Sequence, residues 1–289
     1  MNSKKIVLVT GGAGFIGSHL CEALYNSGKY EVFSLDNYFT GSKDNHINGV
    51  TYIKGNSAEI DFLIDFKPDY IYHLGEYSRV EQSFEDIELV WKFNKDGIFA
   101  VLEFCRKTKA KLIYAGSSTK FGDGGLGRSQ SPYAWAKATN TELVKNYGNW
   151  FGVSYAITYF YNVYGPREIF EGKYATIIGI FKNNFKNNKP LTVVSPGTQK
   201  RNFTHIYDVI DALILVGIKG LGDNYGIGSK EKYSINQIAS MFKTSIVYLP
   251  ERIGNRQDSS IDTSKTESLG WTTKFHISDY INNLISEKN

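Results

Sequence analysis

The sequence predicts an α/β fold, a doubly wound parallel sheet joined to a smaller α/β lobe. Short strands that are apolar throughout alternate with helical patterns over the first half of the chain, and the alternation breaks after Gly165. Apolar strands separated by helices indicate a parallel sheet with helices on both faces. A chain of 289 residues can form two unequal lobes around a cleft.

The elements follow one another in a regular βαβα order. Runs of β-branched and aromatic residues predict strands, and apolar spacings of three and four predict helices. The predicted strands of the sheet are 6–10, 31–35, 51–54, 70–74, 111–115 and 154–160, and the helices between them are 16–26, 59–66, 94–108 and 132–147. Six strands in this order are typical of the doubly wound arrangement. In the smaller lobe we expect strands 191–194, 224–227 and 246–249, with helices 175–187 and 234–241.

Composition excludes several classes of protein. The chain is 42% hydrophobic with 6 Pro and 2 Cys, which excludes collagen-like, disulfide-stapled and disordered proteins. No apolar run approaches the ~20 residues that span a bilayer, so no membrane association is predicted. The net charge of +4 comes from scattered lysines, and we expect no nucleic-acid partner. Cys21 and Cys105 lie in helical patterns, which favours reduced core thiols and a cytoplasmic protein.

A glycine-rich turn follows the first strand and opens a helix. In the segment 10–17 (TGGAGFIG), Gly11 makes the tight turn, Gly14 lets backbone approach a pyrophosphate, and Gly17 allows close packing of the helix. Phe15 and Ile16 then form the first turn of the helix. The N-terminus of a helix offers unpaired backbone N–H groups, which can bind the phosphates. This pattern predicts a dinucleotide site.

The end of the second strand indicates which dinucleotide binds. Asp36 can accept both ribose hydroxyls of the adenosine and repels a 2′-phosphate, and Asn37 rather than a basic residue follows it. The cofactor predicted is therefore NAD. No metal site is predicted.

Three residues form the candidate catalytic set. Tyr133 and Lys137 are spaced i and i+4 on one helix face, and Ser117 ends the fifth strand at the edge of the sheet where ligands bind. A free tyrosine has a pKa near 10, and a neighbouring ammonium lowers that pKa. Tyr133 could then take a hydroxyl proton while Ser117 holds the substrate oxygen by a hydrogen bond.

These motifs together resemble the extended short-chain dehydrogenase/reductases, in particular the NAD-dependent nucleotide-sugar epimerases and dehydratases. The resemblance runs nearly end to end. Beyond the residues above, it is carried by Pro68-Asp69, His73-Leu74, Asn94-x-x-Gly97, Asn162–Arg167, Arg201–Asp208, Arg252–Asn255 and Leu269–Trp271.

The resemblance implies a nucleotide-sugar substrate and further contacts. It divides the chain into a Rossmann domain that binds NAD at 1–162, with roughly 203–219 packing back onto it, and a nucleotide-sugar-binding lobe at 163–289. It implies a homodimer formed by the helices 94–108 and 132–147. Phe99, Trp135 and Leu143 could contribute to it, or could equally face the sheet. The implied cofactor contacts also include Asn56, Ser57, Leu74 and Gly75, and the implied substrate contacts are Ser117, Ser118, Asn162, Arg201 and Arg252.

Departures from the family pattern narrow the reaction. Ser118 and Thr119 stand where the related dehydratases carry acidic residues, so dehydration is not expected. The short chain and the segment 73–83 resemble bacterial capsule-pathway enzymes that oxidise carbon 4 of a GDP-linked manno-heptose. We therefore expect NAD-dependent oxidation at carbon 4, with GDP favoured and UDP or dTDP as alternatives. A 4-epimerase would use the same residues, and a non-catalytic NAD-binding or RNA-binding relative is the third alternative.

Overall fold

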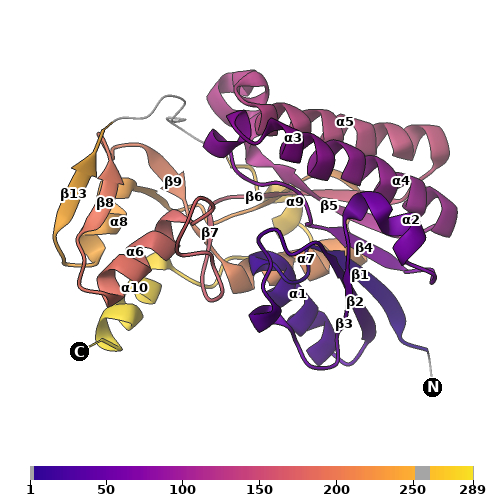
Figure 1. The fold of residues 1–289 in the computed structure, drawn as a ribbon, viewed down its shortest axis with the longest axis horizontal. Coiled ribbons are helices and arrows are strands. Elements are labelled where there is room, and N and C mark those ends of the chain that lie inside the picture. The colour runs from indigo at the N-terminus through magenta and orange to yellow at the C-terminus, as the bar shows by residue number, and fades with distance from the viewer. Residues whose placement is uncertain (1–2, 251–260, 289) are drawn as a thin grey trace.

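A seven-stranded parallel sheet forms the centre of the larger lobe (Figure 1). The computed structural model describes residues 3–250 and 261–288. The strands of this sheet are β1 (Lys5–Thr10), β2 (Tyr30–Asp36), β3 (Thr51–Lys54), β4 (Tyr70–His73), β5 (Lys111–Ser117), β6 (Tyr155–Phe160) and β11 (Gly222–Ile227). Their order is β11-β6-β5-β4-β1-β2-β3, and the winding reverses between β1 and β4. The doubly wound sheet that we predicted is confirmed, and this reversal is where such sheets bind ligands.

The strand β11 differs from expectation. We placed 224–227 in the smaller lobe, whereas β11 pairs with β6 in parallel as the edge strand of the large sheet. Tyr225 and Ile227 are buried there, and Ile227 packs in the same cluster as α7 (Ile206–Lys219). Because α7 covers the sheet, the strand that follows it returns to the sheet edge rather than to the lobe.

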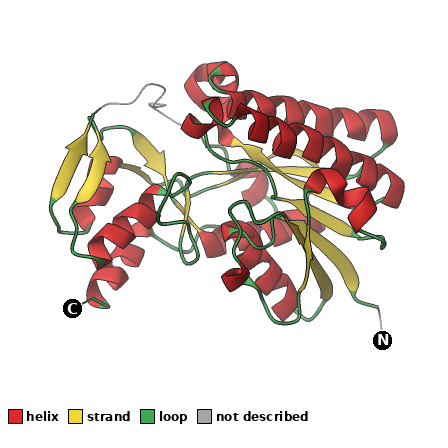
Figure 2. Ribbon diagram, in the orientation of Figure 1, coloured by secondary structure: helices red, strands yellow, loops and turns green. Residues whose placement is uncertain are grey.

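Helices cover both faces of the sheet (Figure 2). On one face, α1 (Phe15–Asn26) packs over β1 and β2, and α7 packs over β5 and β6. On the other face lie α2 (Ile60–Leu63), α4 (Gly97–Thr108) and α5 (Pro132–Phe151). Cys21 is buried in the first core and Cys105 in the second, and both thiols are free.

The helix that we predicted to begin at Asn94 is built in two parts. The chain passes from α3 (Ile87–Val90) through a π-helical turn (Trp91–Asp96) before α4 begins. Asn94 is fully buried in that turn, where its amide accepts from the Tyr77 backbone N–H and donates to the Tyr77 carbonyl. The wider turn lets the side chain reach this loop.

The smaller lobe has a core of its own. Its strands are β7 (Val163–Tyr164), β8 (Leu191–Val194), β9 (Lys200–Asn202), β10 (Thr204–His205), β12 (Lys232–Ser234) and β13 (Ile246–Leu249), and its helices are α6 (Ile177–Lys186), α8 (Ile235–Met241) and α10 (Ile277–Ser286). The strands form three two-stranded sheets, and Phe181, Phe242 and Ile281 are buried among the helices. The short helix α9 (Ser264–Glu267) contacts β11. No helix within the described ranges is long and apolar enough to cross a membrane.

Candidate active site

A cavity of about 500 Å³ lies at the carboxyl ends of the central strands, between them and the first residues of the smaller lobe. It brings together most of the residues predicted from the sequence. Those that line it are Gly11, Gly14, Phe15, Ile16, Gly17, Asp36, Asn37, Ser57, Leu74, Gly75, Ser117, Ser118, Tyr133, Lys137 and Asn162. The cavity is therefore the candidate site for both cofactor and substrate.

The glycine turn has the shape that a dinucleotide requires. Gly11 has a φ of +73°, and a Cβ there would lie 2.8 Å from the Cα of Gly75. A Cβ on Gly17 would lie 2.0 Å from the Gly11 carbonyl oxygen, which fixes the approach of α1 to the turn. At Gly14, by contrast, a Cβ would have one near neighbour, that same carbonyl oxygen at 3.2 Å, and Gly14 lines the cavity. Backbone and helix N-terminus are thus open to a pyrophosphate.

Asp36 is held at the end of β2 by two backbone donors. Its carboxylate accepts from the Ala13 N–H at 2.9 Å and from the Tyr38 N–H at 2.7 Å. Burial raises the pKa of this carboxyl, and the two donors counteract that rise. Its neighbour Asn37 donates to the side chain of Asn56 at 3.0 Å. Asn56 does not line the cavity itself, and it is connected to the cavity through this hydrogen bond with Asn37.

The candidate catalytic residues come from two adjacent elements. Ser117 ends β5, and its hydroxyl lies 2.9 Å from the Thr119 hydroxyl. Tyr133 and Lys137 lie in the first turns of α5, which Ser131 caps by accepting the Ala134 N–H at 3.1 Å. Pro132 occupies the first turn, as the sequence predicts for a helix start. Tyr133 is 9% and Lys137 5% exposed, so both lie in a nearly dry wall of the cavity.

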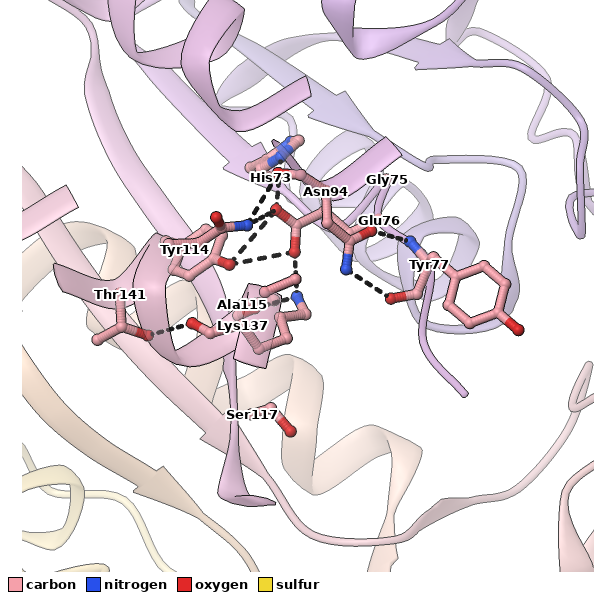
Figure 3. Close-up of polar contacts among 12 residues, drawn as sticks. His73, Gly75, Glu76, Tyr77, Asn94, Tyr114, Ala115, Ser117, Lys137 and Thr141 are labelled. Atoms are coloured by element: carbon pink, nitrogen blue, oxygen red, sulfur yellow. Dashed lines mark hydrogen bonds and ion pairs between the residues drawn. The ribbon is translucent and has the colours of Figure 1, made fainter. Parts of the chain in front are cut away.

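Lys137 is anchored by two oxygens (Figure 3). Its ammonium donates to the Ala115 carbonyl at 2.6 Å and forms an ion pair with the carboxylate of Glu76. The Glu76 side chain is only 2% exposed. Burial on its own would raise the pKa of the Glu76 carboxyl, but the charge of Lys137 and the contact with His73 outweigh burial and hold that pKa below its usual value.

Other polar groups complete the surroundings of Glu76. The Tyr114 hydroxyl donates to it at 3.1 Å, and the Asn140 amide donates at 3.2 Å. His73 is fully buried, with Nε2 3.4 Å from the carboxylate and Nδ1 2.7 Å from the Thr10 hydroxyl. The nearby carboxylate favours the His73 tautomer that carries its proton on Nε2. His73 is thus a packed residue that lies beside Glu76.

One of the predicted substrate contacts lies away from the cavity. Arg201 is on β9 of the smaller lobe and does not line the cavity, and its guanidinium donates to the Lys200 carbonyl at 2.9 Å. Arg252 lies outside the described residues. Asn162 lines the cavity with a φ of +38°, and its amide donates to the Asn202 carbonyl at 2.7 Å.

Sequence reasoning did not assign two features of the site. One is the pairing of Glu76 with Lys137, for which the only signal is an acidic residue directly after the strand end His73–Gly75. The other is a bridge between the lobes, in which Arg79 donates to the Tyr174 carbonyl at 3.0 Å. Asp86 joins that bridge, because it accepts from the Tyr174 hydroxyl at 2.9 Å and pairs with Lys173 at 2.9 Å. No local sequence pattern predicts contacts between segments that lie so far apart in the chain.

Comparison with known proteins identifies the family. The profile of the NAD dependent epimerase/dehydratase family matches residues 7–228. The chain belongs to this family. It is 32% identical to a UDP-N-acetyl-alpha-D-glucosaminuronate decarboxylase of Bacillus cytotoxicus over 260 residues, which cover 82% of this chain and 78% of that protein.

Solved structures agree with the family assignment. The UDP-glucose 4-epimerase of Thermus thermophilus, in complex with NAD, is 28% identical with a TM-score of 0.88 over 98% of both chains. The UDP-glucose 4-epimerase of Thermotoga maritima, with UDP-glucose, is 25% identical with a TM-score of 0.89 over 97% of both chains.

This NAD-dependent epimerase/dehydratase family member is an enzyme that acts on sugar nucleotides, and its cofactor is NAD. The site fits that cofactor, because the open position at Gly14 leaves room for the pyrophosphate and Asp36 lines the same cavity. The predictions of family, enzyme class and cofactor are therefore confirmed.

Proposed function

We propose that this protein oxidises carbon 4 of a nucleotide-linked sugar to the 4-keto sugar, with NAD as the oxidant. One observation carries the proposal. Ser117, Tyr133 and Lys137 line the same cavity as the glycine turn and Asp36. A proton acceptor, an ammonium and a hydroxyl thus lie at the end of the sheet where a bound dinucleotide would place its ring.

Each of the three residues has a distinct role in the proposal. Tyr133 takes the proton of the sugar 4-hydroxyl as a general base. The ammonium of Lys137 favours the phenolate because opposite charges attract. Ser117 holds the reacting oxygen by a hydrogen bond. NAD, when bound, supplies the acceptor for the hydride that leaves carbon 4.

The proposed substrate is a GDP-linked manno-heptose, as in capsule polysaccharide synthesis. Its support is the resemblance of the segment 73–83 and the short chain. Ser118 and Asn162 would contact the sugar nucleotide, and arginines 201 and 252 would reach its diphosphate. The relatives found by comparison carry UDP-sugar names, so UDP-linked sugars are the alternative substrates to test.

A second candidate function is 4-epimerisation. It uses the same oxidation and then returns hydrogen to the opposite face of the 4-keto sugar. Two solved structures that share this fold over almost their whole length are UDP-glucose 4-epimerases, which favours this candidate.

Incubation of the purified protein with single nucleotide sugars tests the proposal. GDP-manno-heptose, UDP-glucose and dTDP-glucose are supplied in turn, and the products are followed by mass spectrometry and by the absorbance of reduced nicotinamide. A 4-keto product with a matching amount of NADH is the expected result. A net epimer formed without any added oxidant or reductant would overturn the dehydrogenase and establish the epimerase.

A further inference from the structure

The lysine of the candidate catalytic set has an unusual set of partners. An ammonium has three donors and no acceptor. Lys137 directs one donor to the Ala115 carbonyl at the end of β5 and another to the Glu76 carboxylate, which leaves one for the cavity. The position of the ammonium relative to Tyr133 is therefore set by Glu76 and by the strand.

Glu76 is itself fixed from every side. His73 faces it from β4, Tyr114 from β5 and Lys137 from α5 (Figure 3). Asn140 of α5 also donates to it, at 3.2 Å. Lys95, from the π-helical turn, donates to the Asn140 side chain at 2.8 Å. These partners restrict the orientation of the Glu76 side chain. The ion pair in turn restricts the position of the Lys137 ammonium.

The charge of the Glu76 carboxylate distinguishes it from a neutral hydrogen-bond acceptor at the same position. A neutral acceptor could hold the ammonium equally well by a hydrogen bond, but it would leave the lysine's positive charge uncompensated. Arg79 also lines the cavity, and its guanidinium donates to the Tyr174 carbonyl at 3.0 Å. Without Glu76, the Lys137 ammonium would lose the carboxylate with which it pairs.

We propose that Glu76 is a positioning residue that holds the Lys137 ammonium against the end of β5 and offsets part of its positive charge at Tyr133. This inference rests on the proposed function, because it assigns Tyr133 the role of base. The carboxylate limits how strongly the lysine favours the phenolate. We therefore expect kcat to rise with pH at higher pH values in the wild type than it would if Lys137 had no carboxylate beside it.

The substitution Glu76→Gln tests the role of the charge. It keeps the shape and a hydrogen-bond acceptor but removes the negative charge. We expect the rising limb of kcat against pH to move to lower pH by about half to one unit, because more positive charge then favours the phenolate. Binding of NADH, titrated by its fluorescence, should be as tight as in the wild type or tighter. An unmoved limb in folded protein would overturn the proposal.

The substitution Glu76→Asp tests the role of position and serves if Glu76→Gln does not fold. It keeps the charge but draws the carboxylate back by one methylene. We expect kcat to fall about tenfold with the sugar KM and the pH limb unchanged, because a displacement near 1 Å is costly in a catalytic set. A kcat within about twofold of the wild-type value would contradict the positioning role.

A matched control separates this role from stability. Asp208 is a fully buried carboxylate outside the cavity that accepts from the backbone N–H groups of Lys274 and Phe275. Asp208→Asn should lower Tm without moving the pH limb, and an equal movement in this variant would overturn the proposal. Tyr133→Phe distinguishes a failure of the proposed function from a failure of the proposed role of Glu76. If that variant keeps its turnover, the proposed function is wrong, whereas an unmoved limb in Glu76→Gln beside an inactive Tyr133→Phe refutes only the role of Glu76.

Discussion

Gly14 and Gly17 lie three residues apart in the turn after β1 but meet different surroundings. A Cβ on Gly14, which lines the cavity, would lie 3.2 Å from the carbonyl oxygen of Gly11, whereas a Cβ on Gly17 would overlap that oxygen at 2.0 Å. One glycine therefore serves the ligand and the other serves the packing of α1. The same substitution at the two positions should have separable effects.

We predict that Gly14→Ala folds with nearly wild-type stability but binds NAD at least about tenfold more weakly, because the methyl group occupies the space of the pyrophosphate. Gly17→Ala should lose about 1–3 kcal/mol of unfolding free energy, because α1 must shift away from the turn. Urea unfolding and NADH titration of both variants check these results. An equal loss of unfolding free energy in the two variants would contradict the assignment of Gly14 to ligand binding and of Gly17 to helix packing.

Single residues were predictable where a spacing or a strand end marks them. The glycine turn, Asp36, Ser117, Tyr133 and Lys137 follow from such local patterns, and all of them line the cavity. The pairing of Glu76 with Lys137 was not predicted, because it depends on α5 and β5 meeting the loop after β4. Sequence spacing carries no information on which distant side chains share one buried space.

At the scale of elements, the start of α6 combines a cap with a buried acid. Thr176 caps the helix by accepting the Gly179 N–H at 3.1 Å, and its hydroxyl donates to Glu168 at 2.6 Å. Glu168 is 3% exposed, and its other carboxyl oxygen has no hydrogen-bond partner. Burial raises the pKa of this carboxyl to about 7.

This raised pKa predicts a loss of stability with rising pH. The folded protein holds the Glu168 proton more tightly than the unfolded chain, so the stabilisation is present at acid pH and is lost as pH rises through about 7. Glu168→Gln should therefore gain roughly 3 kcal/mol over the wild type near pH 8 and less than about 1 kcal/mol near pH 5. Urea unfolding at both pH values measures the difference, and the exposed Glu171→Gln is the control. An equal effect of Glu168→Gln at the two values would refute this explanation.

The long elements were predictable because their apolar patterns are strong. The first six strands of the sheet and the helices α1 and α5 lie close to the predicted ranges. The start of α4 and the place of β11 were not predictable, because each depends on a distant partner. Asn94 bonds to the loop at Tyr77, and β11 returns to β6 only because α7 packs on the sheet.

At the scale of the whole molecule, the helical face formed by α4 and α5 exposes large apolar side chains. Phe99 is 55% exposed and Trp135 41%, and Trp91 stacks on Trp135 with ring centroids 6.0 Å apart. Leu143 instead packs partly against the core beneath the helix. We propose that this face forms the homodimer expected from the resemblance, because such exposed patches mark interaction surfaces.

Light scattering on the purified protein should then give the mass of a dimer. Phe99→Asp should give a monomer, since a charge in the centre of an apolar interface is not solvated. Leu221→Asp changes a residue that is 64% exposed outside these helices and should leave the dimer intact. A monomeric wild type, or a Phe99→Asp variant that remains dimeric, would contradict the proposal.

The most direct test of the proposed chemistry is the rate at which nucleotide sugar reduces bound NAD in a single turnover, compared between wild type and Tyr133→Phe. Tyr233→Phe, in the smaller lobe away from the cavity, is the control. We predict a rate about 10²–10⁴-fold lower in Tyr133→Phe, with NAD still bound and the control unaffected. Equal rates in the wild type and Tyr133→Phe would contradict the assignment of Tyr133 as the base.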